Sequence, residues 1–257
     1  MTLLDRSPST QPEPTASTAS LRRTAMIAGG LYLLTFVTSI PTLPLFAPAQ
    51  LPGFVLGPGP DSGVIVGALL NVVCALAGVG TAVVLFPVVR RRNEALAIGF
   101  VASRVIEGTL IVVGVVALLS LVTLRQDLGG AATGAGAASL LTTGTMLVTV
   151  HGWSFVLGQS LMPVVNALLL GTLMYRSRLV PRAIPVLGLI GAPLLLASVV
   201  ATVCGVFDQV SPVAAVAALP IAVWEFSLGA WLLVKGFTTP PVAGLGAPPA
   251  VPARHEP

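Results

Sequence analysis

Three ionisable residues lie inside long apolar runs of this sequence and are the first candidates for chemistry. Arg104 and Glu107 stand three positions apart in one run, and Glu225 lies in the middle of another. Residues three apart are neighbours on one helix face, so Arg104 and Glu107 can pair. An ionised side chain near the middle of a bilayer costs about 2.5 to 3.5 kcal/mol of insertion free energy. Each of the three therefore needs a polar partner.

The depth of a polar residue in the membrane follows from the helical rise of about 1.5 Å per residue, counted from the basic residues that end each run. Three side chains lie at nearly the same depth, about 15 to 18 Å inward: Arg104, Asn166 and Glu225. We predict an Arg104–Glu225 ion pair, because charges persist in hydrocarbon only when they are neutralised. Further hydrogen bonds complete the candidate polar site, which consists of Arg104, Glu107, Asn166 and Glu225.

Two amide side chains in these runs are secondary candidates. Asn71 belongs to a stripe of small residues at four-residue spacing, where helix backbones approach closely, so we expect it to hydrogen-bond across a helix interface. Gln159 shares one helix face with Pro163 and Asn166. A proline removes one backbone hydrogen bond and can expose carbonyl groups toward a cavity.

Three functions fit this polar cluster. It can be a site for a translocated small molecule or ion, because intramembrane ionisable residues usually mark function. It can instead tie helices together in a structural or accessory protein with a sealed core. An intramembrane enzyme is the weakest alternative, since the sequence shows no His pair at metal spacing, no Gly-x-Ser-x-Gly elbow and no phosphate-binding glycine loop. We therefore expect a protein that is not an enzyme, with no cofactor and no metal.

The apolar runs that carry these residues are long enough to cross a bilayer as helices. Of the 257 residues, 55% are hydrophobic and 9% are charged, whereas soluble domains carry about 25% charged residues. Lipid must therefore solvate much of the exterior. Continuous runs rich in Gly and Ala favour helices over the alternating strands of a membrane barrel. We predict an all-α, polytopic bundle of six transmembrane helices, at residues 24–46, 63–89, 95–123, 150–175, 183–206 and 212–234.

Two tails flank this bundle. Residues 1–20 are rich in Ser, Thr and Pro, and residues 239–257 are rich in Pro, Ala and Gly. Neither segment has the apolar periodicity that would offset the entropy of folding. The sequence therefore predicts two disordered tails around one transmembrane domain at residues 21–238.

The positions of the basic residues predict the orientation of the bundle. Cytoplasmic loops carry an excess of Lys and Arg, and here all but Arg125 of the loop basic residues fall on one side of the predicted helices. The N- and C-termini are therefore expected in the cytoplasm. The net charge of +4 arises beside apolar segments, so we expect the lipid bilayer as partner and not nucleic acid. The residues on the cytoplasmic side are Arg22, Arg23, Arg90, Arg91, Arg92, Arg176, Arg178, Arg182 and Lys235.

One alternative concerns the first apolar run. Arg22 and Arg23 before it, and Ala47-Pro48-Ala49 after it, imitate a twin-arginine or secretory signal with a cleavage site. The run is longer than the roughly 7 to 15 residues of a typical signal. If the first apolar run stays in the mature protein, the basic residues keep their one-sided pattern, so we expect six helices. Cleavage of this run would leave five.

Seven short segments of the sequence form a set: Arg23-Thr-Ala-Met-Ile-Ala-Gly-Gly-Leu-Tyr32, Leu85-Phe-Pro-Val-Val-Arg90, Ala102-Ser-Arg-Val-Ile-Glu107, Arg178-Leu-Val-Pro-Arg182, Gly188-Leu-Ile-Gly-Ala-Pro193, Trp224-Glu225 and Lys235-Gly-Phe237. This set resembles domain of unknown function family 4386, which consists of bacterial multi-pass membrane proteins. The resemblance covers nearly the whole apolar region. It implies a multi-pass protein of the bacterial plasma membrane, and it implies no catalytic residue.

Overall fold

The computed structural model describes residues 18–51, 53–57, 59–130 and 132–238, and helices with short connections account for them without any strand in those ranges. The helical elements are α1 (Thr18–Ser39), α2 (Thr42–Phe46), the 3₁₀ turn η1 (Ala47–Gln50), α3 (Ser62–Val89), α4 (Glu94–Leu124), the π-helical η2 (Arg125–Gly129), α5 (Gly134–Phe155), the π-helical η3 (Val156–Leu161), α6 (Met162–Ser177), α7 (Ala183–Val203) and α8 (Pro212–Val234).

Six helical segments are long and apolar enough to cross a membrane, which confirms the predicted all-α, multi-pass fold. The second, third and sixth, α3, α4 and α8, match the predicted ranges to within one residue at each end. The predicted tails lie outside the described residues, except for positions 18–20, which belong to α1.

The first segment is broken, although the sequence predicted one helix at 24–46. The helix α1 ends at Ser39, and α2 begins only after Pro41. A proline has no N–H for the helical hydrogen-bond ladder, so the chain turns there. The turn places Phe46 beside Gly67 of α3, where even a methyl group would come within 2.6 Å of the ring.

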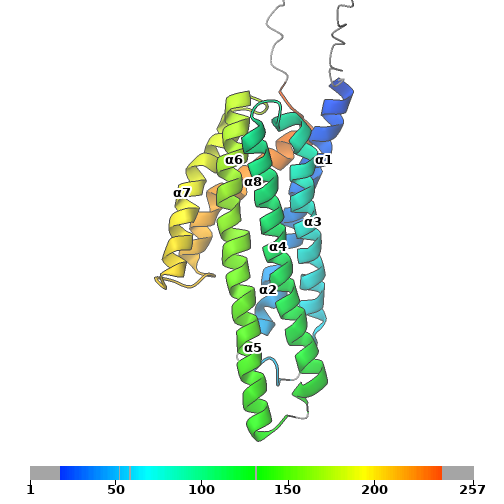
Figure 1. The fold of residues 1–257 in the computed structure, drawn as a ribbon, viewed down its shortest axis with the longest axis vertical. Helices are drawn as coiled ribbons and strands as arrows, with labels where there is room; N and C mark the ends of the chain where they lie inside the picture. The colour runs from blue at the N-terminus through cyan, green and yellow to red at the C-terminus, as the bar shows by residue number, and fades with distance from the viewer. Residues whose placement is uncertain (1–17, 52, 58, 131, 239–257) are drawn as a thin grey trace, which may run out of the picture.

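The fourth segment is much longer than the predicted helix at 150–175. It runs through α5, η3 and α6 from Gly134 to Ser177, a total of 44 residues, or about 66 Å at the helical rise. The hydrocarbon core is only about 30 Å thick, so this rod projects beyond it, and α5 extends past the ends of α7 and α8 (Figure 1). The first part of this segment was not predicted from the sequence, because residues 134–149 are rich in Gly, Ala, Ser and Thr.

Six helices form a closed ring. Going round it, α1 packs against α3, α3 against α4, α4 against α6, α6 against α7, α7 against α8, and α8 against α1 again. Apart from Gln159, which lies in η3 just before α6, the candidate residues lie on the helices of this ring, so the ring decides which of them can meet.

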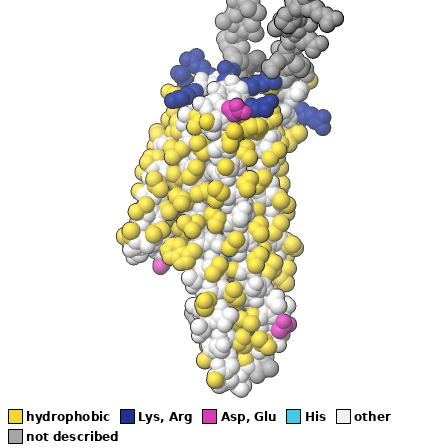
Figure 2. Space-filling view, viewed as in Figure 1, with side chains coloured by type: hydrophobic (Ala, Val, Ile, Leu, Met, Phe, Trp, Pro, Cys, Tyr) yellow, Lys and Arg dark blue, Asp and Glu magenta, His cyan; other side chains and the backbone are white. Residues whose placement is uncertain are grey.

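The exterior of the bundle suits a bilayer. Apolar side chains cover most of the visible face, and Lys and Arg gather at the end where the described chain starts and stops (Figure 2). At the opposite end, Arg125 is buried and pairs with Asp61 at 2.8 Å. Its Nη2 also donates hydrogen bonds to the carbonyl oxygens of Gly57 and Gly59, at 2.9 and 2.7 Å. Arg125 therefore secures the loop before α3.

Candidate functional site

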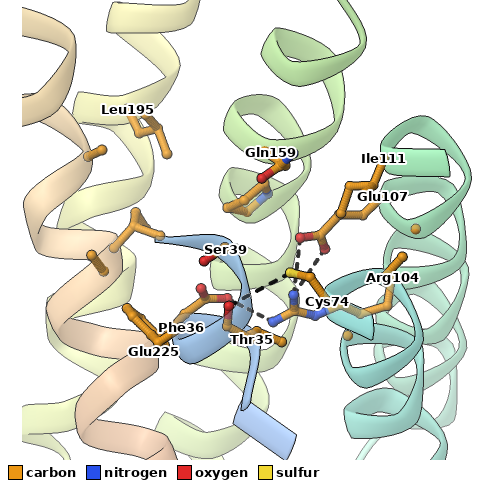
Figure 3. Close-up of a pocket in the computed structure, with 17 residues that line it drawn as sticks. Thr35, Phe36, Ser39, Cys74, Arg104, Glu107, Ile111, Gln159, Leu195 and Glu225 are labelled. Atoms are coloured by element: carbon orange, nitrogen blue, oxygen red, sulfur yellow. Dashed lines mark hydrogen bonds and ion pairs between the residues drawn. The ribbon is translucent and has the colours of Figure 1, made fainter. Parts of the chain in front are cut away.

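Arg104 of α4 lies between two carboxylates (Figure 3). Its Nη1 is 3.0 Å from Oε2 of Glu107, one turn along the same helix, and its Nη2 is 2.7 Å from Oε1 of Glu225 on α8. This contact confirms the predicted Arg104–Glu225 ion pair. Nη2 also donates to the hydroxyl of Tyr32 on α1, at 3.3 Å.

Asn166 of α6 makes two hydrogen bonds to α4. Its Nδ2 donates to Oε2 of Glu107 at 2.7 Å, and its Oδ1 accepts from the hydroxyl of Ser103 at 2.7 Å. All four candidates of the polar site therefore lie in one network, which joins α1, α4, α6 and α8. We call this network the polar cluster; its members are Tyr32, Ser103, Arg104, Glu107, Asn166 and Glu225.

A cavity of about 170 Å³ borders the polar cluster inside the helix ring. A water molecule in the liquid takes about 30 Å³, so several waters, or a small ion with part of its hydration shell, fit this space. Every helix of the ring contributes to the wall, with α6 adding its first turn at Pro163. The wall residues labelled in Figure 3 include Thr35, Ser39, Cys74, Gln159, Leu195 and Glu225.

The two carboxylates of the cluster differ in how they are held. Glu107 accepts two hydrogen bonds from Arg104 and one from Asn166. Glu225 accepts a single hydrogen bond, at Oε1. Its Oε2 has no partner among the described residues, and its side chain remains 15% exposed where it borders the cavity. Both carboxylates line the cavity, and Glu225 is the one that has an oxygen without a hydrogen-bond partner among the described residues.

The charge of the cluster is unbalanced. One guanidinium stands between two carboxylates, so the ionised cluster carries one excess negative charge. The cavity wall, as far as the structure describes it, contains no charged residue besides Arg104, Glu107 and Glu225. An uncompensated negative charge in a low-dielectric site attracts a cation or a proton.

Of the two secondary candidates, only Gln159 lines the cavity. It belongs to η3, and Pro163 follows four residues later. Because proline has no N–H, the Gln159 carbonyl loses its normal helical donor. Single turns of π-helix are frequent at functional sites, and this one brings Gln159 to the cavity wall.

The expected interface hydrogen bond of Asn71 is not present at its side-chain oxygen. Asn71 is buried in α3, but its Oδ1 has no hydrogen-bond partner in the described part of the chain, and it does not line the cavity. The neighbouring turns of its stripe meet apolar groups: Gly67 faces Phe46, and Ala75 faces Gly108.

Tyr32 and Ser103 belong to the cluster but were not among the sequence candidates. Depth counted from the helical rise could have indicated Tyr32. It lies ten residues after Arg22 and thus about 15 Å inward, close to the depth of Arg104. Neither side chain is ionised, so the insertion cost that singled out the charged residues did not reveal them.

The comparison with protein families gave one match. A family model described as Domain of unknown function (DUF4386) matches residues 27–236. No match was found among curated proteins or among solved structures. The matched range contains the whole polar cluster, from Tyr32 to Glu225, and most of the chain. The chain therefore belongs to the DUF4386 family of proteins, as the sequence segments had indicated.

Proposed function

We propose that this integral membrane protein binds and translocates a monovalent cation or a proton, with Glu225 as the residue that receives it. The observation that carries the proposal is the excess negative charge beside a cavity inside a closed helix ring. Glu225 supports this role because it lines that cavity and its Oε2 has no hydrogen-bond partner among the described residues.

The packing around the polar cluster supports binding from the outer side. The cavity wall continues outward from the cluster to Ser39 and Ala218, and Ala218 lies about 9 Å from the outer start of α8. Inward from the cluster, large side chains are fully buried: Leu85, Phe100, Leu170, Met174 and Leu228. Passage to the cytoplasm would therefore require the helices of the ring to move.

We further propose that the termini lie in the cytoplasm of a bacterium, that the membrane is its plasma membrane, and that the chain catalyses no reaction. The basic residues at one end of the bundle support this orientation. The hydrogen bonds that Arg104 and Asn166 make to Glu107 support a role in holding charge over one in catalysis.

A structural role is the second candidate, and the hydrogen bonds within the cluster favour it. Arg104 pairs with both glutamates, and Asn166 bonds to Ser103 and Glu107. The cluster therefore holds four helices together without any ligand. If the role is structural, mutation of the cluster would lower the yield of folded protein, and the wild type itself would show no flux.

A flux assay on the purified full chain in proteoliposomes separates the two candidates. A pH-sensitive dye in the lumen reports proton flux, and radioactive Na⁺ or Rb⁺ reports cation uptake. We expect flux above that of empty vesicles, and a loss of about tenfold or more in Glu225→Gln, because a neutral amide replaces the carboxylate that would hold the cation or proton.

The matched control is Glu94→Gln, the same chemical change at an exposed position in the first turn of α4. It should leave the flux unchanged. Equal flux in the wild type and in Glu225→Gln, at equal amounts of folded protein, would contradict the proposed role of Glu225. Absence of flux for all three probes would favour the structural role.

A further inference from the structure

A second cavity, of about 590 Å³, lies at the basic end of the bundle and shares no residue with the cavity beside the polar cluster. Its wall combines segments that are far apart in the sequence: the start of α1, the end of α3, Leu179, and residues 235–238 after α8. In Figure 2 the Lys and Arg side chains gather at this end. We call it the basic cavity.

Four cationic side chains line the basic cavity: Arg22, Arg91, Arg92 and Lys235. No acidic side chain lines it within the described ranges, and none of the four forms an ion pair there. Arg22 is held in place by hydrogen bonds to the carbonyl oxygens of Leu233 and Val234, at 3.0 and 2.9 Å. These bonds orient its guanidinium, and no carboxylate of the described residues compensates its charge.

The remaining wall of the basic cavity is largely apolar. It includes Leu21, Pro87, Val88, Leu179 and Phe237, with hydroxyl groups from Thr24 and Thr238. The cavity thus offers cations and hydroxyls to an anion, and an apolar surface to a chain attached to that anion. It also lies at the ends of α1, α3 and α8, the level at which lipid headgroups meet a transmembrane bundle.

We propose that the basic cavity binds the headgroup of an anionic phospholipid. The phosphate lies among the four cations, where charge-assisted hydrogen bonds are strong. The glycerol and the first acyl carbons lie along the apolar wall. Basic pockets between transmembrane helices bind anionic headgroups in this way. The proposal requires only the membrane-spanning placement of the bundle and is independent of any transport activity.

A general excess of positive charge at the cytoplasmic face is the competing explanation, because the positive-inside rule places Lys and Arg there without any ligand. The chain provides a matched control. Arg176 and Arg182 are exposed basic residues at the same end but are not part of the basic cavity. Arg91→Gln/Arg92→Gln and Arg176→Gln/Arg182→Gln each remove two charges, but only the first pair removes cations from the cavity, two of its four.

Native mass spectrometry of the full chain in detergent tests the proposal, with phosphatidylglycerol as the anionic probe and phosphatidylcholine as the neutral one. We expect one phosphatidylglycerol to bind more tightly than phosphatidylcholine. In Arg91→Gln/Arg92→Gln its apparent affinity should fall about 30-fold, and in Arg176→Gln/Arg182→Gln it should stay unchanged. If the first variant does not fold, Lys235→Gln should weaken binding about fivefold.

Three results would overturn the proposal. Equal losses in the two double variants would mean that diffuse surface charge attracts the lipid. Equal binding of phosphatidylcholine would mean that the headgroup charge is not recognised. Equal retention of glycerol 3-phosphate at the same concentration would mean that the cavity takes a free phosphate anion and not a lipid.

Discussion

Arg104 controls the charge balance in the core of this protein. Its guanidinium satisfies Glu107 and Glu225 at once, and it lies against the rings of Tyr32 and Phe100, with centroids at 5.3 and 5.8 Å. The sequence alone revealed this residue and its two carboxylate partners, because the cost of burying a charge in hydrocarbon requires neutralisation at the same depth. Which oxygen of Glu225 faces the cavity depends on side-chain geometry that no spacing rule contains.

Removing the guanidinium should destabilise the bundle strongly. Arg104→Met leaves two unpaired carboxylates, and loss of one partner of a buried ion pair costs about 3 to 5 kcal/mol of unfolding free energy. A large part of this loss should return in the triple variant Arg104→Met/Glu107→Gln/Glu225→Gln, which has no buried charge left in the cluster. The free energies of unfolding of the wild type, Arg104→Met and the triple variant, each purified in detergent, measure the difference.

The exposed Arg176→Met serves as the control for this experiment, because its side chain lies outside the polar cluster. It should unfold like the wild type. A triple variant no more stable than Arg104→Met would show that the network contributes through its hydrogen-bond geometry and not through charge balance.

The contact between α1 and α8 depends on two glycines that approach each other closely. A methyl group on Gly29 would lie 2.5 Å from the backbone nitrogen of Leu233 and 2.6 Å from the carbonyl oxygen of Gly229. Backbone atoms cannot move aside as a flexible side chain can. The same two helices provide Tyr32 and Glu225, so this contact also positions the polar cluster.

Two neighbouring glycine variants test this contact. Gly29→Ala should lose about 1 to 3 kcal/mol of stability through overpacking. Gly30→Ala meets nothing within 4 Å and should be neutral or gain up to about 1 kcal/mol from helix propensity. Thermal unfolding of the two purified variants measures the contrast, and equal stability would contradict the close approach of α1 and α8.

The π-helical segment η3 should depend on the proline that follows it. Pro163→Ala restores an N–H that can bond to the Gln159 carbonyl, so the α-helical ladder can continue and hydrogen exchange at residues 156–161 should slow. Pro193→Ala, inside α7, is the control and should leave that segment unchanged. If hydrogen exchange at residues 156–161 is the same in Pro163→Ala as in the wild type, the cause of the π turn is packing against α4, where Gly158 lies next to Leu110.

The closed ring and the segregation of charge give the molecule two distinct ends. Both ends of the described chain emerge beside the Lys and Arg cluster, whereas the link between α7 and α8 lies at the other end of those helices (Figures 1 and 2). That link holds the exposed Cys204, and Cys74 is buried in α3. Labelling of Cys204 can therefore report the orientation of the protein in the membrane.

A membrane-impermeant maleimide should label Cys204 in intact cells, because the positive-inside rule places that link outside the cytoplasm. In a Cys204→Ser background, Glu94→Cys should be labelled only after the membrane is permeabilised. Cys74 should stay unlabelled in both, since it is buried. The reverse pattern would invert the proposed topology.

The sequence was sufficient for the properties that depend on one segment at a time. Composition and run length predicted six membrane-spanning helices, and α3 and α8 agree with the predicted ranges almost residue for residue. Helical rise placed Arg104, Asn166 and Glu225 at one level. These inferences succeed because hydropathy, rise and the cost of a buried charge act on each helix separately.

The contacts between segments were settled by packing in three dimensions. The long rod of α5, η3 and α6 was concealed because small and hydroxyl-bearing residues form helices in contact with neighbours despite a weak apolar signal. The hydrogen bonds of Tyr32, the order of helices in the ring and both cavities likewise depend on which faces meet. That choice is made jointly by all the helices, through backbone approach at residues such as Gly29 and Gly67, and no single segment encodes it.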